Sequence, residues 1–250
     1  MDVEQAGRLT ERPARRRLAG MSAPFRIGFL LYPELTQLDL TGPAQVLGRM
    51  SGAETHLVWK TLDPVRSDGV VTLLPTTPLD ACPQLDLVCV PGGYGCAALM
   101  NDDEVLAWLA RQASGATAVT SVCTGSLVLA AAGLLDGYRA GCHWAWGHHL
   151  ARFGATFVEE RVVIDRNRIT GGGVTAGIDF AFRVVAELRG RDEAEALQLT
   201  VEYDPEPLAG GHPRTARPEV LERVRGLLAT RMSGRQEAIA RAAERYANRR

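Results

Sequence analysis

The sequence predicts an α/β fold built on a doubly wound, mostly parallel sheet with helices on both faces. Short segments that are apolar at nearly every position alternate along the chain with longer helical segments. Continuous apolar strands are typical of a parallel sheet that is covered on both faces. The chain has 250 residues, 46% of them apolar, which is enough for one large core.

The expected strands are short apolar runs bounded by turn residues. They cover 25–31, 56–61, 86–90 and 116–122, with a hairpin or extended excursion at 65–74 and a hairpin at 162–170. The expected helices cover 42–50, 102–113, 125–132, 144–153, 175–189 and 192–203. Pro43 fits the first turn of its helix, where a missing N–H costs nothing, and Gly133 fits a C-terminal cap.

Four regions follow from this pattern. We expect a disordered leader over 1–22, a folded domain over 23–204, a linker over 205–218 and a largely exposed C-terminal helix over 219–250. The segment 213–250 carries ten arginines against four glutamates. These charges alternate with alanines, as on a solvated helix face, so we do not expect nucleic-acid binding.

Composition also bears on location and on metal binding. No apolar run approaches the roughly 20 residues of a membrane helix, and the N-terminus lacks the apolar centre of a secretory signal. A cytoplasmic protein without a membrane partner is expected. The five cysteines are odd in number and form no C-x-x-C pair, which argues against a disulfide framework and a structural zinc site.

Ser121-Val122-Cys123-Thr124-Gly125 is the strongest chemical signal. It has the form small-x-nucleophile-x-Gly between an expected buried strand and an expected apolar helix, which is the thiol counterpart of a nucleophile elbow. Such an elbow lifts the sulfur into a cleft and directs the first N–H groups of the helix toward it, which favours the thiolate. A buried core thiol is the alternative, and the elbow favours the nucleophile.

Asp39 lies between two leucines just before the expected helix that Gly42-Pro43 opens. Burial raises the pKa of a carboxyl group, so Asp39 could serve as a general acid near neutral pH. A helix cap or an Asx-turn explains the same residue equally well.

Residues that could assist are less specific. Thr124 could offer its backbone N–H and its hydroxyl to a substrate, or it could simply cap the helix. Gly92 and Gly93 end a neighbouring strand, so their N–H groups could bind a developing oxyanion, or the pair could form a tight turn. His143, His148 and His149 lack the spacing of a helical metal site, and we interpret them as structural. We assign no functional role to Cys96.

Four segments together resemble the isonitrile (isocyanide) hydratases of the ThiJ/PfpI family, within the class I glutamine amidotransferase-like superfamily. They are 37–43 (QLDLTGP), 90–93 (VPGG), 120–125 (TSVCTG) and 170–180 (TGGGVTAGIDF). The resemblance covers about residues 25–204 and makes the expected domain over 23–204 a ThiJ/PfpI-like catalytic domain. It implies a flavodoxin-like fold, a homodimer, and neither cofactor nor metal.

The resemblance also implies roles and a reaction. Cys123 is the nucleophile, Asp39 is its acid/base partner and Thr124 assists them. The reaction adds water to a small isonitrile and releases an N-substituted formamide through a thioimidate on Cys123. This is the chemistry of a carbon–nitrogen hydro-lyase.

Other functions of related proteins stay open. A peptidase would favour His directly after the nucleophile, where this chain has Thr124, and a glutaminase would need a late His-x-Glu pair, which is absent. A glyoxalase-like enzyme would pair its thiol with Glu instead of Asp39. The segment after Tyr203 is expected to be too short for the paired helix-turn-helix motifs of a regulator. A thiol-based sensor or another amidase-type enzyme remains compatible with the motifs.

Overall fold

A single central sheet carries the fold, and it is almost entirely parallel. In a computed structural model that describes residues 23–231 and 234–249, its strands are ordered β10-β11-β7-β6-β1-β2-β5. Among these described strands, only β10 and β11 of this sheet pair in antiparallel fashion. The strands are β1 (Phe25–Leu30), β2 (Ala53–Trp59), β5 (Thr77–Pro78), β6 (Leu87–Val90), β7 (Ala118–Val122), β10 (Val162–Asp165) and β11 (Arg168–Gly171).

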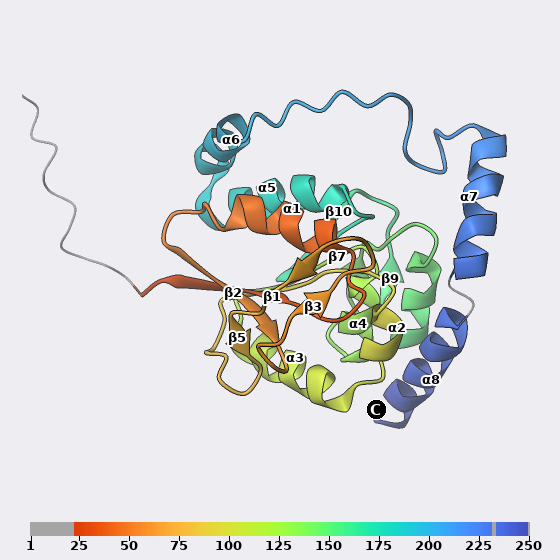
Figure 1. Ribbon diagram of the computed structural model, residues 1–250, viewed down its shortest axis with the longest axis horizontal. Coiled ribbons are helices and arrows are strands. Elements are labelled where there is room, and N and C mark those ends of the chain that lie inside the picture. Colours follow the sequence, from red (N-terminus) through yellow and green to blue (C-terminus); the bar gives the residue numbers. More distant parts are fainter. Residues whose placement is uncertain (1–22, 232–233, 250) are drawn as a thin grey trace, which may run out of the picture.

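Helices cover both faces of this sheet (Figure 1). One layer contains α1 (Gln37–Leu47), α5 (Ala176–Arg189) and α6 (Arg191–Thr200), in which α1 packs on α5 and α5 on α6. The other contains α2 (Cys96–Leu99), α3 (Asp103–Gly115) and α4 (Gly125–Ala131), in which α4 contacts both α2 and α3. The predicted doubly wound α/β architecture is therefore confirmed.

The order of the strands reverses next to β1. From β1 the chain builds outward through β2 to β5 on one side, and through β6 and β7 to β11 on the other. Ligands of such sheets bind beyond the carboxyl ends of the strands, at the point where the order reverses. The segments that follow β1, β6 and β7 all meet at that end of the sheet, which is where the functional site is expected.

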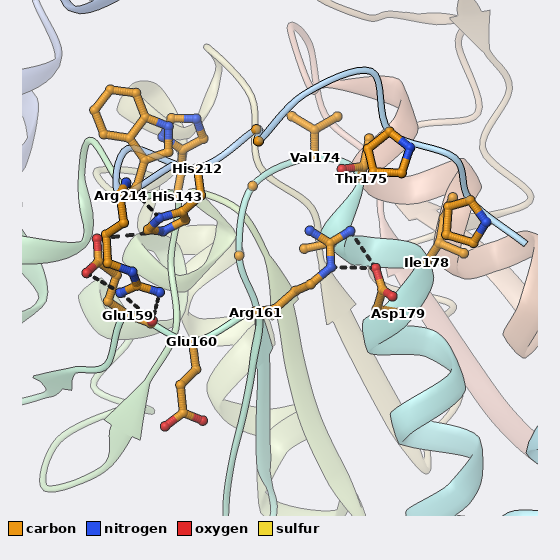
Figure 2. A pocket seen from close by; sticks show the side chains of 18 of the residues that line it. His143, Glu159, Glu160, Arg161, Val174, Thr175, Ile178, Asp179, His212 and Arg214 are labelled. Carbon is orange, nitrogen blue, oxygen red and sulfur yellow. Dashed lines mark hydrogen bonds and ion pairs between the residues drawn. The ribbon is translucent and has the colours of Figure 1, made fainter. Parts of the chain in front are cut away.

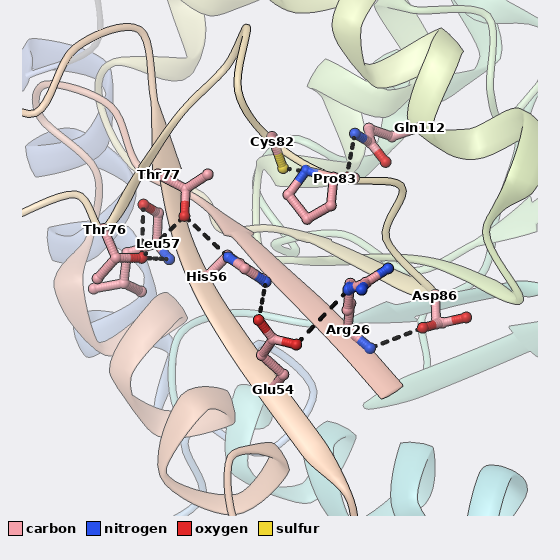
Figure 3. A network of polar contacts seen from close by, with 10 residues as sticks. All are labelled: Arg26, Glu54, His56, Leu57, Thr76, Thr77, Cys82, Pro83, Asp86 and Gln112. Carbon is pink, nitrogen blue, oxygen red and sulfur yellow. Dashed lines mark hydrogen bonds and ion pairs between the residues drawn. The ribbon is translucent and has the colours of Figure 1, made fainter. Parts of the chain in front are cut away.

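Polar contacts tie together strands at the other end of the sheet (Figure 3). The backbone N–H of Arg26 donates to Asp86 at 2.8 Å, and its side chain lies 3.7 Å from Glu54. His56 lies 3.4 Å from Glu54 and 3.0 Å from the hydroxyl of Thr77. This network joins β1, β2 and β5 and contributes none of the residues that were predicted for catalysis.

Both predicted hairpins are present, with β3 (Val65–Arg66) pairing with β4 (Thr72–Leu73) and β10 with β11. A short parallel pair, β8 (Arg139–Ala140) and β9 (Thr156–Phe157), was not predicted. The helix predicted over 144–153 is instead a 3₁₀ helix, η1, over Gly147–Phe153. None of the described helices has the length and apolar character that crossing a bilayer requires.

The first helix begins earlier than the sequence suggested. We predicted that Gly42-Pro43 would open it, but α1 starts at Gln37 and contains Pro43 in its interior. A proline inside a helix removes a hydrogen bond. The Pro43 ring packs closely on α5, where a Cβ atom on Gly177 would lie 3.2 Å from it. This early start places Asp39 inside the helix and not before it.

The C-terminal segment also differs from the prediction of one exposed helix over 219–250. It forms two helices, α7 (Pro218–Arg231) and α8 (Arg235–Asn248). The buried residues of α8 recur at helical spacing, namely Arg235, Ala238, Ile239, Ala242 and Tyr246. This stripe packs α8 against α2, α4 and η1, so the helix belongs to the folded body. The predicted leader over 1–22 lies outside the described residues.

Candidate active site

The chain turns sharply at Cys123, between β7 and α4. Cys123 has a φ angle of +58°, in the left-handed region that side chains other than glycine seldom adopt. The neighbouring small residues make the turn fit. A Cβ atom on Gly125 would lie only 2.0 Å from the carbonyl oxygen of Val90, and the buried hydroxyl of Ser121 lies 2.8 Å from that of Ser126. The strained, tightly packed elbow predicted from the sequence is present, and strain of this kind concentrates at functional sites.

The sulfur of Cys123 borders a small cavity. Its side chain is only 6% exposed, yet the residue lines a cavity of about 150 Å³. The cavity walls come from eight separate parts of the chain. The lining residues are Thr36, Asp68, Gly93, Tyr94, Cys123, Thr124, His143, Trp146, Val174, Leu228 and Arg235. Cys123 is therefore accessible to a small molecule and is not sealed in the core.

Asp39 is a fully buried carboxyl group held by a distant part of the chain. It lies in the first turn of α1, is 0% exposed, and accepts a 2.9 Å hydrogen bond through Oδ2 from the backbone N–H of Gly92. The N-cap residue of α1 is Thr36, and no side chain caps the helix. The structure thus decides between the two interpretations of Asp39: it is a buried carboxyl group and not a helix cap.

Cys123 and Asp39 are neighbours. A Cβ atom on Gly92 would lie 2.7 Å from Oδ2 of Asp39, 2.8 Å from Cβ of Cys123 and 2.7 Å from the backbone nitrogen of Thr124. All three groups therefore surround one point, which only a glycine leaves free. Gly92 is required here for close approach, because any side chain would push the carboxyl group and the thiol apart.

Burial raises the pKa of Asp39 to about 7, since the charged form loses its hydration. The hydrogen bond from Gly92 and the nearby thiol of Cys123 oppose part of this rise, whereas the charge of Asp68 adds to it. The other carboxylate oxygen, Oδ1, accepts no well-formed hydrogen bond from any described residue. Asp39 therefore changes protonation state near neutral pH, as a group that both takes and gives a proton must.

A stability measurement checks this pKa. Because the folded-state pKa of Asp39 lies above its ordinary value of 3.8, its protonated form favours the fold, and this contribution is lost as pH rises from about 4 through about 7. The loss amounts to about 4 kcal/mol at most. Asp39→Asn removes the titration, so urea unfolding should show the variant gaining stability over the wild type at pH 8 but much less at pH 5. An equal difference at both pH values would contradict a titrating, buried carboxyl group.

The pKa of Cys123 differs from the sequence-based prediction. We predicted a thiolate stabilised by the elbow, but burial raises the pKa of Cys123, and the charge of Asp39 raises it further. The backbone N–H groups of Val174 and Thr124 lie within hydrogen-bonding reach of the sulfur and lower the pKa, without offsetting burial. The resting form is therefore a thiol, and a thiol must lose its proton for its sulfur to act as a nucleophile. The adjacent Asp39 carboxylate is placed to accept that proton.

Gly92 and Gly93 do not present free N–H groups. The N–H of Gly92 donates to Asp39, and the N–H of Gly93 donates to the hydroxyl of Thr124 at 3.1 Å. The prediction of an oxyanion-binding pair is wrong, because both donors already have partners within the protein. They hold Asp39 and Thr124 in place. The hydroxyl of Thr124 in turn donates to the sulfur of Cys96 at 3.3 Å, although Thr124 still lines the cavity.

Two wall residues from the C-terminal segment were missed. Leu228 of α7 and Arg235 of α8 both line the Cys123 cavity. Arg235 is 3% exposed, which corrects the interpretation of this arginine-rich segment as a solvated helix face. Their role depends on contacts between distant parts of the chain, so no local sequence signal identifies them.

A larger cavity of about 920 Å³ is shown in Figure 2, and two of its wall residues, His143 and Val174, also line the small one. Two ion pairs lie along its wall: Arg161 with Asp179, at 2.5 Å, and Arg214 with Glu159, at 2.6 Å. His143 and Val174 therefore lie between the Cys123 cavity and the larger one. Among residues 23–231 and 234–249, no group of three or more His, Cys, Asp or Glu side chains is placed to hold a metal ion.

The chain is a doubly wound α/β protein that carries a cysteine on a strained elbow between a strand and a helix. These two features define its structural class. The model of the DJ-1/PfpI family matches residues 25–187, so the chain belongs to that family. The chain is 50% identical to the isonitrile hydratase of Pseudomonas putida over 219 residues, which cover 87% of this chain and 96% of the relative.

Two further comparisons define the limits of this similarity. The crystal structure of a ThiJ/PfpI family protein from Pseudomonas syringae matches with a TM-score of 0.84 and 42% identity, over 92% of this chain and 98% of that one. The HTH-type transcriptional regulator GbdR of Pseudomonas aeruginosa is 33% identical over 72% of this chain, but the match spans only 51% of the regulator. The regulator therefore shares this domain and has a second half that the match does not include.

Proposed function

We propose that this protein is an isonitrile hydratase that adds water to a small isonitrile and releases an N-substituted formamide. The observation that carries the proposal is the contact between the elbow thiol of Cys123 and the buried carboxyl group of Asp39. The 50% identity to the Pseudomonas putida isonitrile hydratase, over nearly the whole of that enzyme, supports it.

The first step joins the thiol to the isonitrile. The terminal carbon of R–N≡C accepts the sulfur of Cys123 as a new C–S bond forms. The thiol proton passes to the Asp39 carboxylate, which then delivers it to the same carbon. The product is a thioimidate, R–N=CH–S–Cys123. Since the pKa of Asp39 is about 7, the carboxyl group can both accept and return this proton near neutral pH.

The second step releases the product. The Asp39 carboxylate takes a proton from water as the water oxygen bonds to the thioimidate carbon, and passes this proton to the nitrogen, which gives R–NH–CH(OH)–S–Cys123; the hydroxyl proton of this intermediate later returns to the sulfur through Asp39. The C–S bond of the resulting tetrahedral intermediate breaks, the sulfur recovers its proton, and R–NH–CHO leaves. Thr124 supports both steps by holding the Gly93 loop, through the 3.1 Å hydrogen bond that its hydroxyl accepts.

Several finer statements belong to this proposal. The reaction needs no cofactor, because a polarisable sulfur and one carboxyl group supply the nucleophile and every proton transfer. We place the enzyme among the carbon–nitrogen hydro-lyases, as a cytoplasmic homodimer that binds neither nucleic acid nor membranes. The five cysteines are free, which agrees with a reducing compartment. The catalytic domain is built on 23–204 and followed by the linker over 205–218, and the C-terminal helix α8 packs against it.

A direct assay tests the proposed function. The full-length protein is incubated with a simple alkyl isonitrile such as isobutyl isonitrile, and N-isobutylformamide is measured by mass spectrometry. Enzyme-dependent formation of the formamide, with oxygen from ¹⁸O-labelled water in the carbonyl group, is the expected result. Absence of the formamide across a series of small alkyl isonitriles would rule the proposal out.

A further inference from the structure

The Cys123 cavity contains a buried positive charge, Arg235, the first residue of α8. Its side chain is only 3% exposed. One guanidinium nitrogen, Nη2, donates a 2.5 Å hydrogen bond to the carbonyl oxygen of Gly93, and the guanidinium carbon lies 5.0 Å from the centre of the Trp146 ring. These contacts fix the guanidinium group against the wall that also carries the reactive thiol.

Half of this guanidinium fork has no partner. The other nitrogen, Nη1, is buried and makes no hydrogen bond with any described residue, and no described carboxylate forms an ion pair with Arg235. Arginine is almost never buried without a partner, because an unpaired charge in a protein interior is costly. A carboxylate suits a guanidinium fork in both charge and geometry. The unpaired nitrogen thus indicates an anionic partner that is not part of the protein.

The other polar wall residues do not fill this role. Asp68 accepts a 2.5 Å hydrogen bond from the hydroxyl of Thr36 and remains partly exposed. Burial and the charge of Arg235 lower the pKa of His143 to about 4, so His143 is neutral at pH 7 and adds no second positive charge. Arg235 is therefore the charged group among the described wall residues that is left to bind an anion.

The size of the cavity limits that anion. A volume of about 150 Å³ is about five times the ~30 Å³ that a water molecule occupies in the liquid. A small molecule of this order of size fits beside Cys123. Isocyanoacetate, in which one methylene group separates the isonitrile from a carboxylate, is of this size.

We propose that Arg235 determines specificity by binding a carboxylate on the substrate, so that short isocyano carboxylates such as isocyanoacetate are the preferred isonitriles. This inference rests on the proposed function and names its substrate class. The isonitrile carbon faces Cys123 while the carboxylate binds Nη1 of Arg235. The C-terminal helices thereby complete a site whose reactive groups belong to the α/β core.

The kinetic test compares two substrates of equal size. Isocyanoacetate carries a carboxylate where isobutyl isonitrile carries an isopropyl group. The full-length wild type should prefer isocyanoacetate at least 10-fold in kcat/KM. Arg235→Met keeps an unbranched apolar side chain but removes the guanidinium group, and should lower kcat/KM for isocyanoacetate by about 10- to 100-fold relative to that for isobutyl isonitrile, mostly through KM. Arg235→Lys should restore part of the loss.

Arg241→Met serves as a matched control, because Arg241 lies on the same helix with a largely exposed side chain, 62% accessible. It should leave both substrates unaffected. If wild type and Arg235→Met show the same ratio between the two substrates, Arg235 has no role in specificity and the inference is wrong. If the wild type hydrates isobutyl isonitrile but not isocyanoacetate, the proposed function holds and this inference is wrong.

A binding measurement tests the carboxylate site independently of turnover. In the Cys123→Ala background, calorimetry should show N-formylglycine, the product of isocyanoacetate, binding at least 10-fold tighter than N-isobutylformamide. Adding Arg235→Met should abolish this difference. Equal affinity of the two formamides for the Cys123→Ala protein would contradict the carboxylate site, whether or not the enzyme hydrates isonitriles.

Discussion

Cys123→Ala is expected to lower the rate of formamide formation by more than about 10⁴-fold, because alanine provides no atom to form the thioimidate. The fold should survive, since the change removes a single atom at the edge of a cavity. Thermal unfolding and circular dichroism check the fold, and product formation from isobutyl isonitrile checks the activity.

Cys82→Ala is the matched control for this prediction. Cys82 is free and partly buried, and its thiol donates to the carbonyl oxygen of the adjacent Pro83 at 3.5 Å. This variant should keep the full rate. Substantial turnover by Cys123→Ala would show that the reaction does not pass through this sulfur.

Asp39→Asn is expected to lower the rate at least 100-fold, which is about the usual size of a lost general acid–base contribution. Asparagine has the same shape and can still accept the 2.9 Å hydrogen bond from Gly92 through its side-chain oxygen. It cannot take the proton from the Cys123 thiol. The rate should therefore fall without a loss of stability. Asp86→Asn, at the opposite end of the sheet, is the control and should leave the rate unchanged.

The pH profile adds a second readout for Asp39. The pKa of Asp39 is about 7 in the folded protein because of its burial, and the carboxylate is the form that accepts the thiol proton. For the wild type, kcat/KM should rise with pH and level off above about 7. The residual activity of Asp39→Asn should lack this inflection. If Asp39→Asn keeps the wild-type rate, the role of Asp39 is structural and not catalytic.

The parts of the fold that depend on local patterns were predictable. The buried strands β6 and β7 are apolar enough to be identified directly, and the elbow at Cys123 has all its determinants within five consecutive residues. The start of α1 was not predictable, because Pro43 in isolation indicates a first turn. In the folded protein Pro43 lies inside the helix and packs closely on Gly177 of α5.

The remainder of the site depends on contacts between distant segments. The carboxyl group of Asp39 is held by Gly92, 53 residues further along the chain, and this contact decides between a cap and a buried acid. Arg235 reaches the carbonyl oxygen of Gly93 across 142 residues. In sequence it is one of many arginines that alternate with glutamates, and nothing local distinguishes it from its exposed neighbours.

The prediction that Cys123 rests as a thiolate was wrong for the same reason, namely that it depends on contacts between distant segments. The elbow does bring N–H groups to Cys123, as the sequence indicated, but the extent of burial depends on the whole fold. Burial and the nearby carboxyl group together keep the thiol protonated at rest. The proposed mechanism therefore gives Asp39 a part in the attack itself, in addition to its part as the later proton donor.

Mass spectrometry of the wild type, acid-quenched within its first turnovers on isobutyl isonitrile, probes the Cys123–Asp39 pair most directly. The thioimidate should appear as a mass increase equal to the whole isonitrile molecule, located by peptide mapping on Cys123, and it should be absent from Asp39→Asn. Formamide accumulating with no adduct, or an adduct on Cys96 or Cys142 instead, would contradict the assignment of the sulfur and its neighbouring acid.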